Sequence, residues 1–110
     1  MITGIEVDRL PLQEIVRRIL AVSRPRRIIL FGSATTGRLT PDSDIDLLVL
    51  EDAPRDPRQE SVRLRKSLGD IGHPLDVLVM STDRFEETKD LVGGIAFPAH
   101  RYGKVLYEAA

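Results

Sequence analysis

Two aspartates and a glycine–serine pair, separated by ten residues, form the part of this chain whose spacing predicts chemistry. Gly32-Ser33 follows the apolar run 27–31, and Asp44-Ile45-Asp46 opens a second apolar run that continues to Leu50. Aspartates at positions i and i+2 of a strand project from the same face. Two carboxylates held this closely repel each other unless a cation lies between them, and a hard divalent ion with oxygen ligands is the natural occupant.

A third carboxylate, Asp76, lies inside the apolar run 75–80. An ionised carboxylate within a buried strand is costly unless it is paired or bound to a metal. We therefore expect Asp44, Asp46 and Asp76 to converge on one point, where they would hold divalent ions and activate a hydroxyl for in-line attack on a phosphate. Taken singly, each aspartate has an ordinary alternative: a cap at a loop end, a solvated strand position, or a partner of one of the 16 basic residues.

The Gly32-Ser33 turn offers groups that bind an anion close to these carboxylates. Glycine permits the backbone to approach a ligand, and the serine hydroxyl can donate to a phosphate oxygen. Backbone N–H groups at such a turn also bind anions. The chain has neither the Gly-Lys-Ser/Thr ending of a P-loop nor a Gly-x-Gly-x-x-Gly fingerprint. A cation site beside an anion cradle is the pattern expected for a nucleoside triphosphate.

The periodicity of apolar residues predicts the elements that must position these groups. Helices are expected over 11–22, 57–68 and 83–91, and strands over 27–31, 44–50, 75–80 and 104–108, the last with a turn of helix as the alternative. At the start of the third helix, Asp83 with Glu86 fits a capping box, and Ser81 is the competing cap. This order predicts an α+β fold, a small mixed β-sheet covered by helices.

Length and composition limit the class of protein. With 110 residues, 42% of them apolar, the chain is expected to form one domain, residues 1–110, with a modest core. The net charge of −1, from 16 basic and 17 acidic residues, argues against a protein that mainly grips duplex nucleic acid. The lack of cysteine excludes disulfides and thiolate nucleophiles. Neither a signal peptide nor an apolar run of roughly 20 residues is found, so we expect a cytoplasmic protein without a membrane span.

A cluster of basic residues lies on the predicted second helix and the loop before it. Its members are Arg55, Arg58, Arg63, Arg65 and Lys66. Such a run is usually a solvated helix face, and the near-neutral total charge favours that interpretation. An acidic partner or RNA is the alternative for this face.

The combination of these motifs resembles the signature of the polymerase-beta-type nucleotidyltransferase superfamily. The stretches 29–33 and 43–49 are similar to those of the minimal nucleotidyltransferases, or MNT proteins, many of which are encoded beside a HEPN-domain partner as toxin–antitoxin pairs. The similarity extends from the first helix to the tail. The resemblance implies the polymerase-beta-like fold and the transfer of a nucleoside monophosphate, usually from ATP, to a hydroxyl with release of pyrophosphate.

The resemblance also implies roles for individual residues. Gly32 and Ser33 would hold the triphosphate, and Asp44, Asp46 and Asp76 would hold two Mg2+ ions. Asp76 would also assist in deprotonating the acceptor hydroxyl. In several HEPN-paired members the acceptor is a tyrosine of the partner toxin, whose ribonuclease activity is silenced by adenylylation. The leading expectation is therefore an antitoxin that transfers AMP from ATP to a HEPN-type toxin.

One departure from the family pattern keeps alternatives open. Many members carry arginines at the first and third positions after the Gly-Ser pair, where this chain has Ala34 and Thr36. Arginines would add charge-assisted contacts to phosphates, and Arg38 or the basic second helix is the candidate substitute. The alternatives are a binding module that neutralises its partner by masking it, and a nucleotidyltransferase that acts on a small molecule or an RNA end. Association with itself or with a partner is expected in each case.

Overall fold

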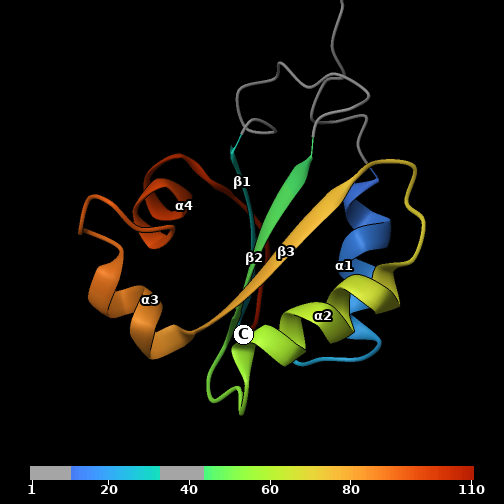
Figure 1. Cartoon of the computed structure of the whole chain (residues 1–110), viewed down its shortest axis with the longest axis horizontal. Coiled ribbons are helices and arrows are strands. Elements are labelled where there is room, and N and C mark those ends of the chain that lie inside the picture. Colours follow the sequence, from blue (N-terminus) through green and yellow to red (C-terminus); the bar gives the residue numbers. More distant parts are fainter. Residues whose placement is uncertain (1–10, 33–43) are drawn as a thin grey trace, which may run out of the picture.

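A mixed four-stranded sheet with helices on both faces forms the part of the chain that the structure, a computed structural model, describes: residues 11–32 and 44–110 (Figure 1). In chain order the elements are α1 (Leu12–Leu20), β1 (Arg27–Phe31), β2 (Ile45–Glu51), α2 (Pro57–Leu68), β3 (Leu75–Ser81), α3 (Thr82–Thr88), α4 (Ala96–Tyr102) and β4 (Lys104–Glu108). The predicted α+β class, with a mixed sheet covered by helices, is thus confirmed.

The sheet has the strand order β3-β2-β1-β4. β1 pairs antiparallel with both β2 and β4, whereas β2 and β3 are parallel and are joined through α2, as a parallel pair requires. In the parallel pair, Ile45 lies opposite Leu75 and Asp46 lies opposite Asp76. The starts of two neighbouring strands therefore meet at the same end of the sheet.

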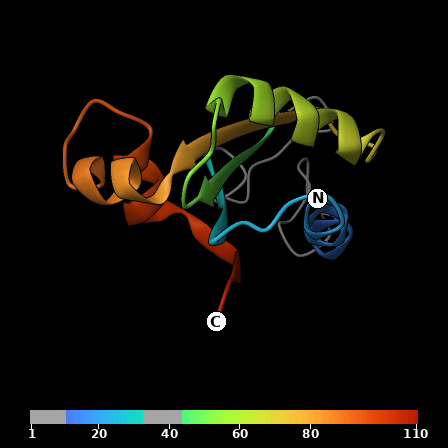
Figure 2. The same ribbon diagram turned by 90° about the horizontal axis from the view of Figure 1, so that it is seen from below.

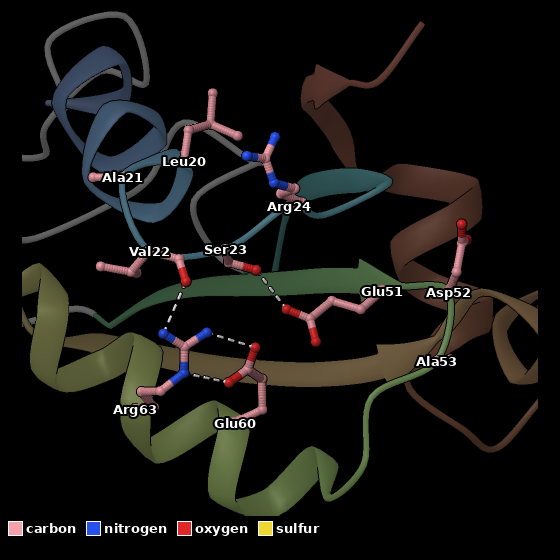
Figure 3. A pocket seen from close by; sticks show the side chains of 10 residues that line it. All are labelled: Leu20, Ala21, Val22, Ser23, Arg24, Glu51, Asp52, Ala53, Glu60 and Arg63. Atoms are coloured by element: carbon pink, nitrogen blue, oxygen red, sulfur yellow. Dashed lines mark hydrogen bonds and ion pairs between the residues drawn. The ribbon is translucent and has the colours of Figure 1, made fainter.

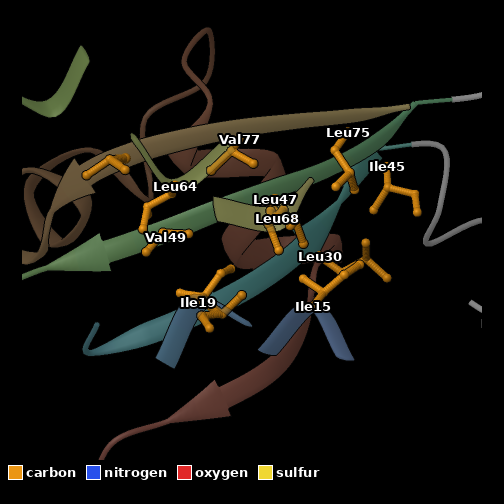
Figure 4. Packing of buried hydrophobic residues seen from close by; sticks show 12 residues of the cluster. Ile15, Ile19, Leu30, Ile45, Leu47, Val49, Leu64, Leu68, Leu75 and Val77 are labelled. Carbon is orange, nitrogen blue, oxygen red and sulfur yellow. The ribbon is translucent and has the colours of Figure 1, made fainter. Parts of the chain in front are cut away.

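Alternation along the strands divides the core into two layers. Ile45, Leu47, Leu75 and Val77 pack with Ile15 and Ile19 of α1 and with Leu64 and Leu68 of α2 (Figure 4). On the other face, Leu48 and Leu50 pack with Phe85 of α3 and with Ala96 and Ala99 of α4. The two views of the ribbon agree with this division, since α1 and α2 lie on one side of the sheet and α3 and α4 on the other (Figures 1 and 2). Residues that alternate with Ile45 and Leu75 consequently face the α3/α4 side.

The first two helices follow the sequence pattern closely. α1 ends at Leu20 rather than at the expected Val22, and α2 has the predicted bounds. The Asp56 side chain caps α2 by accepting hydrogen bonds from the backbone N–H groups of the residues two and three positions later. Leu64 and Leu68 are buried, whereas Val62 is 51% exposed because it lies on the outer face of the helix.

The region after β3 departs most from the prediction. Ser81, not Asp83, caps α3 by accepting from the N–H of Arg84, and α3 ends at Thr88 instead of Leu91. The helix α4 was not predicted, because it has seven residues, no side-chain cap and a proline. Pro98 is tolerated because it falls in the first turn, where its missing N–H has no helical partner to lose. None of the helices in the described ranges has the length and apolar character that a membrane span requires.

Candidate active site

Two of the three predicted carboxylates lie side by side on neighbouring strands. Asp46 of β2 and Asp76 of β3 are register partners, and both project from the α3/α4 face because their neighbours Ile45 and Leu75 point into the opposite core layer (Figure 4). Asp46 is half-buried and Asp76 is exposed. Asp44 is exposed and lies just before β2, not on the strand as expected. The strand pairing therefore brings Asp46 and Asp76 together and leaves Asp44 beside them at the strand entry.

Electrostatics couple the three carboxylates. The pKa of Asp46 is raised above its ordinary value of 3.8, first by burial and then by the negative charges of Asp76 and Asp44. Burial and like charge both disfavour the ionised form of a carboxyl. A cation placed against Asp46 would offset both effects, so the arrangement favours a positively charged ligand.

Gly32 lies against Asp46 at the end of β1. Its φ is +75°, a conformation that favours glycine, and the preceding residue Phe31 is the register partner of Asp46. A Cβ at position 32 would overlap Asp46 Oδ2 and lie 3.2 Å from Asp46 Cγ. The glycine is therefore required here by backbone conformation and by space. Ser33, Ala34, Thr36 and Arg38 lie outside the described residues.

A backbone hydrogen bond fixes the two strand starts relative to each other. The N–H of Ile45 donates to the carbonyl oxygen of Pro74 across 2.8 Å, so the peptide after Asp44 is tied to the residue before β3. Pro74 was not predicted to have a part in the site. No residue type signals this contact, because the acceptor is a backbone carbonyl group, which every residue has.

The donor set fits a hard divalent ion in chemistry, since carboxylate oxygens are the ligands that Mg2+ prefers. Asp46 and Asp76 are adjacent, and neither side chain makes an ion pair or hydrogen bond with the residues described. Within residues 11–32 and 44–110, however, no three His, Cys, Asp or Glu side chains are close enough together to hold a metal ion as they stand. The structure thus supplies a carboxylate pair, with Asp44 next to it.

The cavities found in the described ranges lie elsewhere. One of about 670 Å³ lies at the other end of β2, where Glu51, Glu60 and Arg63 line it (Figure 3). Its carboxylates already have internal partners: Ser23 Oγ donates to Glu51 at 2.6 Å, and Arg63 Nε donates to Glu60 at 2.6 Å. An additional cation is not needed there, so this cavity is not the candidate site.

Comparison with known proteins adds a family and a fold. The family model described as a nucleotidyltransferase domain matches residues 11–97. No curated protein sequence matches the chain. Among solved structures, a mutant of the toxin–antitoxin MntA-HpeT gives a TM-score of 0.64 at 19% identity, covering 91% of this chain and 75% of that one. A toxin–antitoxin with AMP-PNP gives 0.64 at 20% identity with the same coverage, and a second MntA-HpeT mutant gives 0.60 at 22%, covering 92% and 75%. At these identities the likeness establishes the fold.

Proposed function

The chain belongs to the nucleotidyltransferase domain family and is an enzyme of that class, and from this premise we propose that it transfers AMP from ATP to a hydroxyl group. The observation that carries the proposal is the parallel register that sets Asp46 beside Asp76, with Gly32 packed against Asp46. This arrangement combines a place for cations with an adjacent turn for phosphates. One solved neighbour is a toxin–antitoxin with AMP-PNP, which supports a nucleotide as ligand.

In the proposed reaction the aspartates and the glycine turn have different tasks. Asp44, Asp46 and Asp76 hold Mg2+, and Gly32 and Ser33 hold the triphosphate. When bound, Mg2+ neutralises phosphate charge and lowers the pKa of the attacking hydroxyl. Asp76, the more exposed member of the pair, accepts the proton of that hydroxyl.

The balance of bonds follows the usual course of phosphoryl-type transfer. The acceptor oxygen forms a bond to the α-phosphorus, and the bond from that phosphorus to the oxygen bridging to the β-phosphate breaks in line. AMP remains on the acceptor, and pyrophosphate leaves with the electron pair of the broken bond. The half-burial of Asp46 lowers the local dielectric, which strengthens its attraction for a cation.

The acceptor that we propose is a tyrosine of a HEPN-type partner toxin, which makes this chain an antitoxin. The solved neighbours described as toxin–antitoxin assemblies support a toxin as partner. The resemblance of the 29–49 region to MNT proteins supports the HEPN type and the tyrosine. We place the reaction in the cytoplasm, where ATP and Mg2+ are available.

The test is a transfer assay with ATP labelled at the α-phosphate, Mg2+ and the protein encoded next to this gene. We expect label on a tyrosine of that protein, and its loss when Asp44→Ala replaces the native chain. Glu51→Gln, at the other end of β2, is the matched control and should keep the transfer. Label on RNA or on a small molecule would change the acceptor, whereas neutralisation that survives Asp44→Ala without any label would establish masking instead of catalysis. Ala34 and Thr36, in place of the usual arginines, are the feature that favours masking.

A further inference from the structure

The outer edge of β3 is covered by side chains of α2. β3 is the edge strand next to β2 in the described sheet, and the backbone groups of an edge strand usually lack partners on one side. Here the N–H of Val79 donates to Ser61 Oγ at 2.9 Å, and Arg65 Nε donates to the carbonyl oxygen of Leu75 at 3.2 Å. Ser61 and Arg65 are one helical turn apart, so α2 replaces the missing strand at two points.

Arg65 also binds the end of its own helix. Its Nη1 donates to the carbonyl oxygen of Gly69 at 3.3 Å, where α2 ends in a residue with φ of +59°. A cation at the C-terminus of a helix interacts favourably with the exposed carbonyl groups there. One guanidinium therefore links the end of α2 to the first residue of β3, across the connection 69–74.

Two consecutive carbonyl groups at the start of β3 are thus held from opposite sides. Pro74 O accepts from the N–H of Ile45 on the β2 side, and Leu75 O accepts from Arg65 on the outer side. The next residue is Asp76, whose carboxylate lies beside that of Asp46. Two ionised carboxylates on paired positions of neighbouring strands repel each other. An edge strand bound only on its β2 side would relieve this repulsion by moving outward.

We infer that Arg65 is a positioning residue for the transfer site: by fastening the first residue of β3 to the end of α2, it keeps Asp76 in register with Asp46. The expected effect on metal binding rests on the proposed function. The claim that Arg65 fastens the start of β3 to the end of α2 does not depend on it. Arg65 differs in this respect from its equally exposed neighbour Lys66, whose side chain makes no ion pair or hydrogen bond with the described residues. It acts through the backbone and does not touch the reacting atoms.

The test measures Mn2+ binding to the full chain, with Arg65→Ala compared against Ser61→Ala and Lys66→Ala. Ser61→Ala is the matched control because it removes the other α2 bond to the same strand edge, three residues beyond Asp76. We expect Arg65→Ala to weaken Mn2+ binding about tenfold, as outer partners of metal ligands commonly do. Ser61→Ala should lower the melting temperature and leave Mn2+ affinity within about twofold, and Lys66→Ala should change neither. Arg65→Lys, which retains one donor group toward Leu75, should recover part of the affinity.

A second measurement separates this inference from the proposed function. Amide hydrogen exchange over residues 75–77, recorded without metal, should accelerate in Arg65→Ala relative to Lys66→Ala. Unchanged exchange together with unchanged Mn2+ affinity would overturn the inference, as would an equal loss of affinity in Ser61→Ala. If the native chain itself binds no Mn2+ while Arg65→Ala still accelerates exchange at 75–77, the proposed function fails and the structural role of Arg65 stands.

Discussion

Carboxylates gather at both ends of β2, but only at one end do their side chains have partners among the described residues. At the end of the strand, Glu51 accepts from Ser23, and Glu60 is paired with Arg63. Arg63 also donates to Val22 O at 2.8 Å (Figure 3). At the start of the strand, the side chains of Asp46 and Asp76 make no ion pair or hydrogen bond with any residue the structure describes, although their charges act on each other.

The difference suggests a structural role for the carboxylates at the end of β2 and a cation-binding role for those at its start. Arg63, which is paired with Glu60 and bonded to Val22 O, joins α2 to the segment after α1 and contributes to stability. Carboxylates held together without such partners cost stability, because burial and like charge both oppose ionisation. An external cation would offset this cost, and for that reason we propose the start of β2, not its end, as the site.

The largest expected effect comes from neutralising one carboxylate at the start of β2. Asp46→Asn should lower the rate of AMP transfer on the order of 10²–10³-fold, as the loss of one charge-stabilising group commonly does. The melting temperature should not fall, because the substitution removes a repulsion and fills the same space. The measurements are transfer of α-phosphate label and thermal unfolding.

Glu51→Gln is the comparison for that variant, since it neutralises a carboxylate at the other end of the same strand. It should leave transfer within about twofold, because Glu51 lies at the opposite end of β2 from Asp46 and its partners are internal. Equal losses of activity in the two variants would show that the ends do not differ in the way proposed here.

Gly32→Ala should reduce both activity and stability. The new Cβ would overlap Asp46 Oδ2, and alanine is strained at a φ of +75°, so we expect a loss of about 1–3 kcal/mol in the free energy of unfolding. Gly93→Ala is the control for strain alone, because φ there is +112° but nothing lies within 4 Å of the added Cβ. The two are compared by denaturant unfolding and by the transfer assay. Retention of full activity in Gly32→Ala would exclude close contact between this turn and the reacting groups.

Arg63→Ala should lower stability and leave transfer unchanged. The substitution removes the partner of Glu60 and the donor to Val22 O, and we expect it to cost about 1 kcal/mol in the free energy of unfolding. Chemical denaturation measures the loss. A fall in transfer rate without a fall in stability would contradict the assignment of this end to structure.

The smallest effect is a pH dependence at Glu51. Its pKa is raised above the ordinary 4.5, foremost by burial and also by a hydrogen bond in which it holds the proton toward Glu60. The folded chain therefore binds this proton more tightly than the unfolded chain, and stability falls as pH rises through the raised pKa. The Glu51→Gln variant has no carboxyl to ionise at this position and so does not lose stability as the pH rises. Its melting temperature should exceed that of the native chain by roughly 2 °C at neutral pH. The difference should vanish below pH 4.5, and a difference that persists there would point to a cause other than charge.

Much of the fold could be predicted because it depends on local patterns. Local patterns were enough to predict β1, β2, β3 and α2. The apolar runs of the strands and the spacing of apolar residues in the helix do not depend on tertiary contacts. Predicting β4 from a pattern of five residues was correct, and pairing with β1 stabilises that strand. The choice between Ser81 and Asp83 as cap of α3, and the existence of α4, depended on contacts with the sheet that no local pattern contains.

The candidate site divides in the same way. Spacing alone identified Asp44, Asp46 and Asp76 as acidic positions beside a glycine turn. It placed Asp44 on the strand, however, whereas β2 begins one residue later, at Ile45, whose N–H donates to the carbonyl oxygen of Pro74. Neither that bond nor the contacts of Arg65 could be predicted, because each joins residues whose proximity arises only when β3 pairs with β2.

The amino-acid sequence by itself determined that Asp46 and Asp76 lie on the opposite face of their strands from Ile45 and Leu75, because strand alternation is a property of the backbone. Only the tertiary structure decided that Asp46 and Asp76 are neighbours while Glu51 is paired with internal groups. The reason is that the parallel register between β2 and β3 is set by non-local hydrogen bonds and by core packing, and those act only once the chain has folded.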